Sequence, residues 1–135
     1  MKSNLATLKK ALFSLRLGVF IVMFMWTIDK FVNPGHAQKV FEKFYLIEGM
    51  STGITYGIAI IQLILVMAFL LGIKKKLSYG AILAMHAAST FSSYAIYLDP
   101  WGPRNLLFFA AWPMLAAIFS LFILREDDTL FTVKI

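Results

Sequence analysis

Two polar side chains, His86 and Gln62, stand deep inside long apolar stretches of this chain and could bind a ligand there. His86 follows Leu77, the start of its stretch, by about nine residues, so a helix would carry it roughly 14 Å into a bilayer. An ionisable residue at that depth is a candidate functional site. The alternative is a histidine that bonds a neighbouring helix and serves the structure alone. A buried Gln62 needs hydrogen-bond partners, so we expect it to face the protein interior.

Charged residues bound the first apolar stretch and leave it short. Twelve residues lie between Arg16 and Asp29, whereas a spanning helix uses about 20. Arg16 and Lys30 would be roughly 21 Å apart along a helix, so one charge must lie in the membrane or both must extend toward its surfaces. Placing Arg16 against lipid would cost ~2.5 kcal/mol or more. We therefore expect Arg16 to face either the cytoplasmic surface or a polar cavity between helices.

The composition indicates a membrane protein. Hydrophobic residues make up 60% of the sequence, charged residues 15%, and the mean hydropathy is +0.77, which would give a poor surface for a soluble domain. The net charge of +6 could suggest nucleic acid, but the basic residues stand at the ends of apolar stretches and predict membrane topology instead. The sequence has no cysteine, which excludes disulfides, thiolate metal sites and iron–sulfur ligation by this chain.

Four apolar stretches predict four membrane-spanning helices. They cover about 12–30, 53–73, 77–98 and 106–124. We therefore predict an all-α polytopic membrane protein whose single domain, 1–135, is a four-transmembrane-helix bundle. The first stretch could also be a cleavable signal peptide, because small residues flank His36. Asp29 and Lys30 before that position, and the apolar stretches after it, favour a retained helix.

The connection between the first two spans contains an amphipathic run. Asn33-Pro34-Gly35 ends the first helix. Five apolar residues then share one face, opposite charged ones: Ala37, Val40, Phe41, Phe44 and Tyr45 against Lys39, Glu42 and Lys43. This pattern predicts a short interfacial helix over one mouth of the bundle. The alternative is a plain linker with solvated charges.

The distribution of lysine and arginine predicts the orientation. Nine of these residues fall on one side of the predicted spans and four on the other. The nine are Lys2, Lys9, Lys10, Arg16, Lys74, Lys75, Lys76, Arg125 and Lys134, and the four are Lys30, Lys39, Lys43 and Arg104. Since the cytoplasmic side carries the excess, we expect both termini in the cytoplasm.

Small and polar residues are spaced to share helix faces. Gly49, Gly53 and Gly57 recur every four residues, a spacing that lets two helix backbones approach closely in lipid. In the third span, Ser89, Thr90 and Ser93 extend the polar side of His86. In the fourth, Trp112-Pro113 predicts a kink or a local gap in the backbone hydrogen bonding, and a kink often marks a cavity wall.

Two short motifs frame the first span. Leu15-Arg16-Leu17-Gly18 stands at its head, and Ile28-Asp29-Lys30-Phe31 followed by Pro34 closes it. Together they resemble the DoxX family of small four-helix membrane proteins, although the histidine and glycine that usually precede the lysine are absent from Met25-Trp26-Thr27-Ile28-Asp29. The resemblance implies a four-helix bundle in a bacterial inner membrane, associated with quinone-linked or thiol-stress oxidoreductase systems.

Two classes of function fit these features. In the first, the chain is a noncatalytic anchor or assembly subunit that contacts lipid and other membrane subunits or further copies of itself. In the second, it is a redox subunit in which Arg16, Gln62 and His86 converge and donate hydrogen bonds to a quinone, against an apolar wall of Trp112 or Phe109. A small-molecule carrier is a third reading, but the sequence has no inverted repeat.

The candidate cavity residues come from all four predicted spans. They are Arg16, Asp29, Lys30, Gln62, His86, Ser89, Thr90, Ser93 and Trp112. We expect this cavity to open toward the end of the bundle that carries Asp29 and Trp101. A quinone is the one cofactor that the resemblance to the DoxX family implies, and no metal site is predicted. One intramembrane histidine cannot form a bis-histidine haem pair, because His36 falls in the outer connection.

Overall fold

The structure is a computed structural model that describes residues 2–134, and within that range all regular structure is helical. The elements in chain order are α1 (Lys2–Val32), α2 (Pro34–Tyr45), α3 (Thr52–Leu71), α4 (Lys75–Ser92), α5 (Tyr94–Tyr97), the 3-10 helix η1 (Asn105–Ala110) and α6 (Ala111–Ile123). Three segments are long and apolar enough to cross a membrane: Asn4–Val32, Thr52–Leu71 and Asn105–Ile123. The chain is therefore an all-helical protein suited to a membrane, and a fourth span through α4 remains a prediction.

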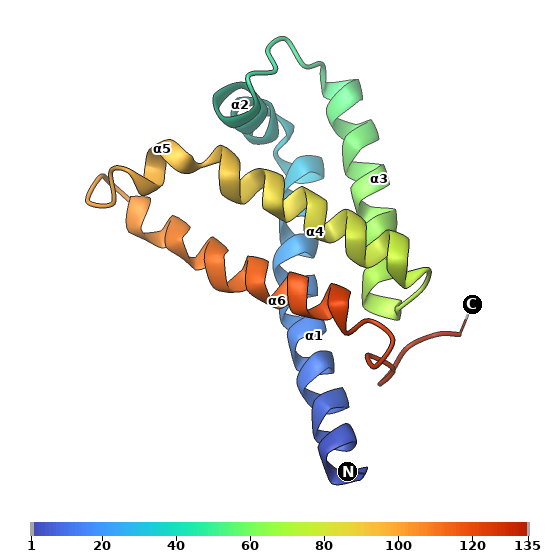
Figure 1. The fold of residues 1–135 in the computed structure, drawn as a ribbon. Coiled ribbons are helices and arrows are strands. Elements are labelled where there is room, and N and C mark those ends of the chain that lie inside the picture. The colour runs from blue at the N-terminus through green and yellow to red at the C-terminus, as the bar shows by residue number, and fades with distance from the viewer. Residues whose placement is uncertain (1, 135) are drawn as a thin grey trace.

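The helices form two pairs that meet at one end. α1 packs along α3, and α4 packs along α6. A core of large apolar side chains joins the pairs where they meet; it consists of Leu12, Val19, Met23, Val66, Phe69, Tyr79, Ile82, Ile118 and Leu121. At the other end the pairs diverge, and the hairpin of α5 and η1 lies away from α3 (Figure 1). The structure therefore has one packed end and one open end.

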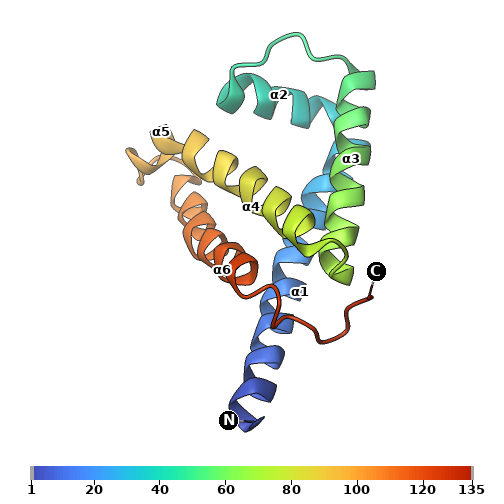
Figure 2. The ribbon, with the colours of Figure 1, turned by 45° about the vertical axis from the view of Figure 1, so that its right-hand side comes forward.

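The amphipathic run after the first span is a helix, as predicted. Pro34 occupies the first turn of α2, where its missing N–H costs no hydrogen bond. Ala37 is buried on the inner side of α2. Figure 2 shows α2 and the α4–α6 pair extending to the same side of α1 and α3, one above the other. α2 thus covers one side of the space between the helix pairs, and we call it the roof helix.

The third and fourth predicted spans are less regular than expected. The predicted helix 77–98 ends at Ser92, and a single turn, α5, follows. Ser93 donates its hydroxyl to the carbonyl of Ser89 at 2.9 Å, a back-bond of the kind that bends helices. In the fourth span, 105–110 is a 3-10 helix, so Pro113 falls in the first turn of α6. An N–H in that first turn has no partner within α6 to lose, so Pro113 is tolerated there, and the kink expected at Pro113 stays a prediction.

The C-terminal tail folds back onto the packed end and supplies a carboxylate to the interior. Asp128 is fully buried and pairs with Arg16 of α1, which is also fully buried. Tyr79 donates its hydroxyl to the second oxygen of Asp128 at 2.6 Å. Lys75 donates to the main-chain carbonyls of Arg125 and Asp128. We call Arg16, Lys75, Tyr79 and Asp128 the Asp128 cluster.

Candidate functional site

A cavity of about 1130 Å³ lies between the two helix pairs, beneath α2. α1 and α3 form one wall, α4 and the start of α6 form the other, and η1 contributes Phe108 at the open end. Most of the lining is aliphatic or aromatic, including Met23, Trp26, Phe41 and Phe44. A large apolar pocket with a few polar groups is the usual form of a small-molecule site.

His86 presents an unpartnered nitrogen at this cavity. The side chain of His86 is 1% exposed and lines the cavity from α4. Its Nε2 lies 3.0 Å from the carbonyl oxygen of Ala111, while its Nδ1 is buried with no hydrogen-bond partner among the described residues. A buried polar atom left unpaired costs roughly 1–3 kcal/mol. Trp26 stacks on the imidazole with the ring centroids 6.0 Å apart and holds the ring in place.

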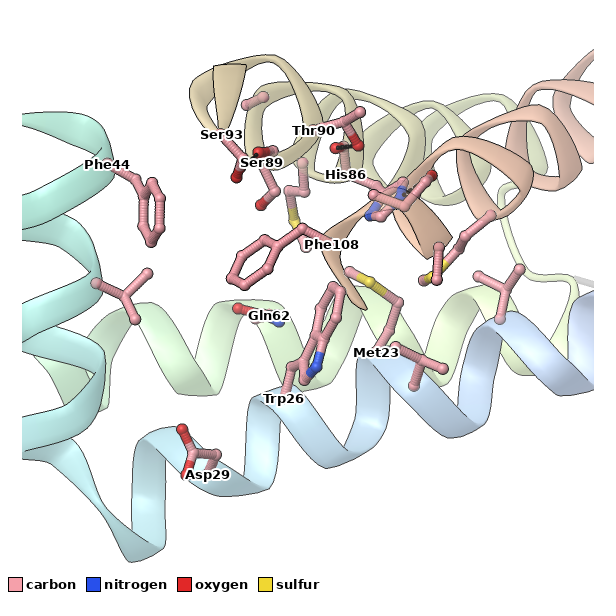
Figure 3. Close-up of a pocket in the computed structure, with 18 of the residues that line it drawn as sticks. Met23, Trp26, Asp29, Phe44, Gln62, His86, Ser89, Thr90, Ser93 and Phe108 are labelled. Carbon is pink, nitrogen blue, oxygen red and sulfur yellow. Dashed lines mark hydrogen bonds between the residues drawn. The ribbon is translucent and has the colours of Figure 1, made fainter. Parts of the chain in front are cut away.

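Gln62 is another polar group of the cavity lining without a partner. It lines the cavity from α3, is 8% exposed, and makes no hydrogen bond to another described residue. Figure 3 shows Gln62 on the opposite wall from His86, with Trp26 and Phe108 between them. An amide offers both donors and an acceptor. The hydroxyl of Tyr97, which also lines the cavity, is likewise buried with no hydrogen-bond partner among the described residues. The cavity therefore has unpartnered polar groups on both sides.

The hydroxyl groups near His86 are already engaged. Thr90 donates to the carbonyl of His86 at 2.8 Å, and Ser93 bonds Ser89 in the same way. The hydroxyl of Ser89 shares a hydrogen bond of 2.7 Å with that of Tyr45. Thr90 and Ser93 thus line the cavity without offering a free donor. The Tyr45–Ser89 bond connects the roof helix α2 to α4.

Charged residues stand at the cavity mouth formed by α1 and α2. Asp29 and Lys30 both line it, as predicted. His36 of α2 donates through Nδ1 to the carboxylate of Asp29 at 2.6 Å. Lys30 lies 3.5 Å from the carbonyl of Trp26, one turn earlier. The pair Asp29–His36 joins the two helices across the bend at Pro34.

Arg16 does not belong to the cavity, and the prediction that it converges with Gln62 and His86 was wrong. Its guanidinium is fully buried in the Asp128 cluster and also donates to the carbonyl of Leu130. The inward direction expected for Arg16 is correct. A buried guanidinium requires a counter-charge and acceptors. Both come from the C-terminal tail, and no pattern in the sequence predicts that the tail lies there.

Trp112 also lies outside the cavity, although its neighbours Ala111 and Pro113 line it. The side chain of Trp112 is 41% exposed and packs edge-on against Phe91, with ring centroids 5.7 Å apart. It also packs against Tyr97. Because adjacent residues of a helix point about 100° apart, the same turn that brings Ala111 to His86 directs Trp112 outward.

The glycine line of α3 makes no close contact within this chain. Gly49 lies in the preceding loop with φ +69°, and Gly53 and Gly57 are exposed. A methyl group added at Gly57 would meet no atom within 4 Å, and at Gly53 only the hydroxyl of Ser51 at 3.9 Å. Their predicted role in helix packing therefore requires a neighbouring molecule.

The predicted set covered only part of the cavity lining, and the polar or aromatic residues that it left out include Trp26, His36, Tyr45 and Tyr97. Trp26 stands one turn before Asp29 and Lys30, so its place on the same helix face could have been found. His36 and Tyr45 depend on how α2 folds over the cavity, which spacing does not reveal. Among residues 2–134, no three histidine or acidic side chains are grouped so as to hold a metal ion.

Comparison with known proteins found no counterpart for this chain. No protein family, curated protein or solved structure matched it.

Proposed function

We propose that this chain is a DoxX-like integral membrane subunit that holds a ring-bearing lipid of the quinone class in the cavity between its helix pairs. The observation that carries the proposal is the pair of unpartnered polar groups, His86 Nδ1 and Gln62, on opposite walls of a largely apolar cavity. An unpaired polar group in an apolar interior is costly, and a ligand that bonds to both groups removes that cost.

The lining suits a flat ring with an apolar tail. Trp26, Phe44 and Phe108 surround the cavity with aromatic surface, which packs well against another ring. The volume of about 1130 Å³ is slightly above the usual range for small-molecule pockets, ~300–1,000 Å³, which leaves room for part of a lipid tail. A lipid tail could leave between the diverging ends of the helix pairs, where η1 is exposed.

The chain would act as a noncatalytic subunit of a membrane oxidoreductase system. It has no cysteine and only one histidine within its apolar stretches, so we propose that a partner protein supplies the electron-transfer centre. The proposed topology has four spans with both termini in the cytoplasm of a bacterial inner membrane, which places α2 on the outer surface. The excess of lysine and arginine at the other end of the spans supports this orientation.

The test is purification from the native membrane directly into lipid nanodiscs, followed by mass spectrometry of the extracted lipids. We expect a quinone-class lipid at a stoichiometric level, lost in His86→Leu and reduced in Gln62→Leu. Thr55→Val is the matched control. Thr55 is a buried polar residue on the same helix as Gln62, but the hydroxyl of Thr55 already donates to the carbonyl of Ser51. A full complement of quinone in His86→Leu, or no enrichment over bulk lipid in the unmodified protein, would refute the proposal.

A role as an anchor or assembly subunit is the second candidate, and the exposed glycines of α3 favour it. Gly53 and Gly57 leave an unobstructed strip along the helix, as a close helix–helix contact requires. Gly57→Leu should then remove a copurifying partner or dissociate an oligomer while lipid binding persists. Gly35→Leu on α2 is the control, since Gly35 is also an exposed helical glycine with no atom near its Cβ position and does not line the cavity.

A further inference from the structure

The tautomer of His86 decides which group a ligand must present to it. The carbonyl oxygen of Ala111 can only accept a hydrogen bond, so Nε2 of His86, 3.0 Å away, carries the hydrogen. A second hydrogen on Nδ1 would put a positive charge with no partner into apolar surroundings. The neutral ring, with a lone pair on Nδ1, is therefore the favoured form. Nδ1 can accept a hydrogen bond but cannot donate one.

The ring is held in this orientation from two sides. Ala111 bonds Nε2, and Trp26 stacks on the ring at an interplanar angle of 24°. Turning the imidazole by half a turn about the Cβ–Cγ bond would place Cε1 where Nε2 now lies and would break the bond to Ala111. Figure 3 shows His86 reaching from α4 toward Trp26 and Phe108, which border the cavity.

We propose that the ligand of this cavity carries a hydroxyl group, which donates a hydrogen bond to Nδ1 of His86. The inference rests on the proposed function and names the chemical form that the site takes. A carbonyl oxygen has no hydrogen to donate, and its lone pairs would face the lone pair of Nδ1. Among ring lipids of the quinone class, the site therefore selects the reduced form, with two hydroxyls, over the oxidised form, with two carbonyls. This reverses the sequence-based expectation that His86 donates to a quinone carbonyl.

Gln62 does not discriminate between these forms. Its amide can donate to a carbonyl and can accept from a hydroxyl, and it makes no bond to another described residue that would restrict this choice. His86 sets the preference for the reduced form, whereas Gln62 contributes to the affinity for both forms. Substitution of His86 should therefore change the ratio of the two affinities, whereas substitution of Gln62 should weaken both affinities and leave their ratio unchanged.

The test measures binding of decylubiquinol and decylubiquinone to the purified full-length protein in phosphatidylcholine nanodiscs, with empty nanodiscs as the baseline. A Trp101→Phe, Trp112→Phe background leaves Trp26, which lines the cavity, as the fluorescent reporter. Gain of one hydrogen bond should make the reduced probe bind roughly tenfold tighter than the oxidised probe. His86→Phe should abolish that ratio. Gln62→Leu should weaken both probes by a similar factor and keep the ratio.

The outcomes separate this inference from the proposed function. Equal affinities in the unmodified protein, or a ratio unchanged by His86→Phe, would overturn the inference while leaving a quinone-class ligand in place. Failure of both probes to bind above the baseline would overturn both. As a measurement that needs no change at His86, ¹⁵N NMR of histidine-labelled His36→Gln protein should show an unprotonated Nδ1 that shifts on addition of the reduced probe. A protonated Nδ1 would overturn the inference.

Discussion

The Asp128 cluster and the cavity use buried polar residues in opposite ways. In the Asp128 cluster, Arg16 bonds one oxygen of Asp128 and Tyr79 the other, so the buried charges are paired although Nε of Arg16 has no partner among the described residues. In the cavity, Nδ1 of His86 and the amide of Gln62 have no protein partner. The two regions lie in one small protein, so this difference shows that a polar residue in an apolar stretch indicates function only when its partners are missing.

The physical reason is the cost of an unpaired polar group. A cluster whose charges are paired and whose acceptors are bonded holds helices together and has little to gain from a ligand. A group left unpaired is destabilising by itself and is relieved by a ligand. We therefore expect substitutions in the Asp128 cluster to reduce stability, and substitutions in the cavity to reduce binding.

The largest effect is expected for Asp128→Leu. It leaves the fully buried Arg16 without its counter-charge, and breaking such a pair costs about 3–5 kcal/mol of unfolding free energy. Unfolding by SDS titration in mixed micelles measures the loss. Asp127→Leu is the control, because Asp127 is the exposed neighbour in the same tail. Equal stability of the two variants would show that the Asp128 cluster does not hold the tail.

Tyr79→Phe should have the next largest effect. It removes the hydroxyl that donates to Asp128 and keeps the ring that packs on Phe69. Hydrogen bonds to charged groups contribute roughly 1.5–3 kcal/mol, so the same titration should show a loss in that range. Tyr94→Phe, on an exposed tyrosine, should leave the unfolding free energy unchanged. A loss in both variants would point to a general effect of removing tyrosine hydroxyls.

Tyr45→Phe tests the connection between the roof helix and the cavity wall. It removes the hydrogen bond to Ser89, with an expected loss of about 0.5–1.5 kcal/mol and faster backbone hydrogen exchange in α2. Hydrogen exchange followed by mass spectrometry resolves the region. Tyr56→Phe, which keeps the ring stacked on Phe31, should leave the exchange of α2 as it was. Unchanged exchange in Tyr45→Phe would mean that this bond does not hold the roof.

His86→Leu should have the smallest effect on stability and the clearest effect on binding. The substitution loses the bond to Ala111 but also removes the unpaired Nδ1, so the unfolding free energy should change by less than about 1 kcal/mol. The copurifying lipid should be lost. A drop of several kcal/mol would identify His86 as a structural histidine and place it with the Asp128 cluster.

Much of the helical framework was predictable from local pattern. The stretches around α1 and α3, and the amphipathic α2 after Asn33-Pro34, follow from hydropathy and helix-breaking residues. The ends of the third and fourth stretches were less predictable. The break at Ser93 and the 3-10 geometry of 105–110 depend on how the hairpin packs rather than on local preference.

The candidate site, like the helical framework, was predictable in some features and unpredictable in others. Gln62 and His86 stand near the centres of their apolar stretches, so their burial could be predicted from the hydropathy of those stretches. The difference between these two residues and Arg16 could not be predicted, because none of the three side chains finds a hydrogen-bond partner within its own helix. Only the tertiary structure brings Asp128 from the far end of the chain to Arg16 and leaves His86 with a single partner. Helix rotation and the path of the tail are set by contacts between distant segments, and these contacts decide which buried polar group remains free for a ligand.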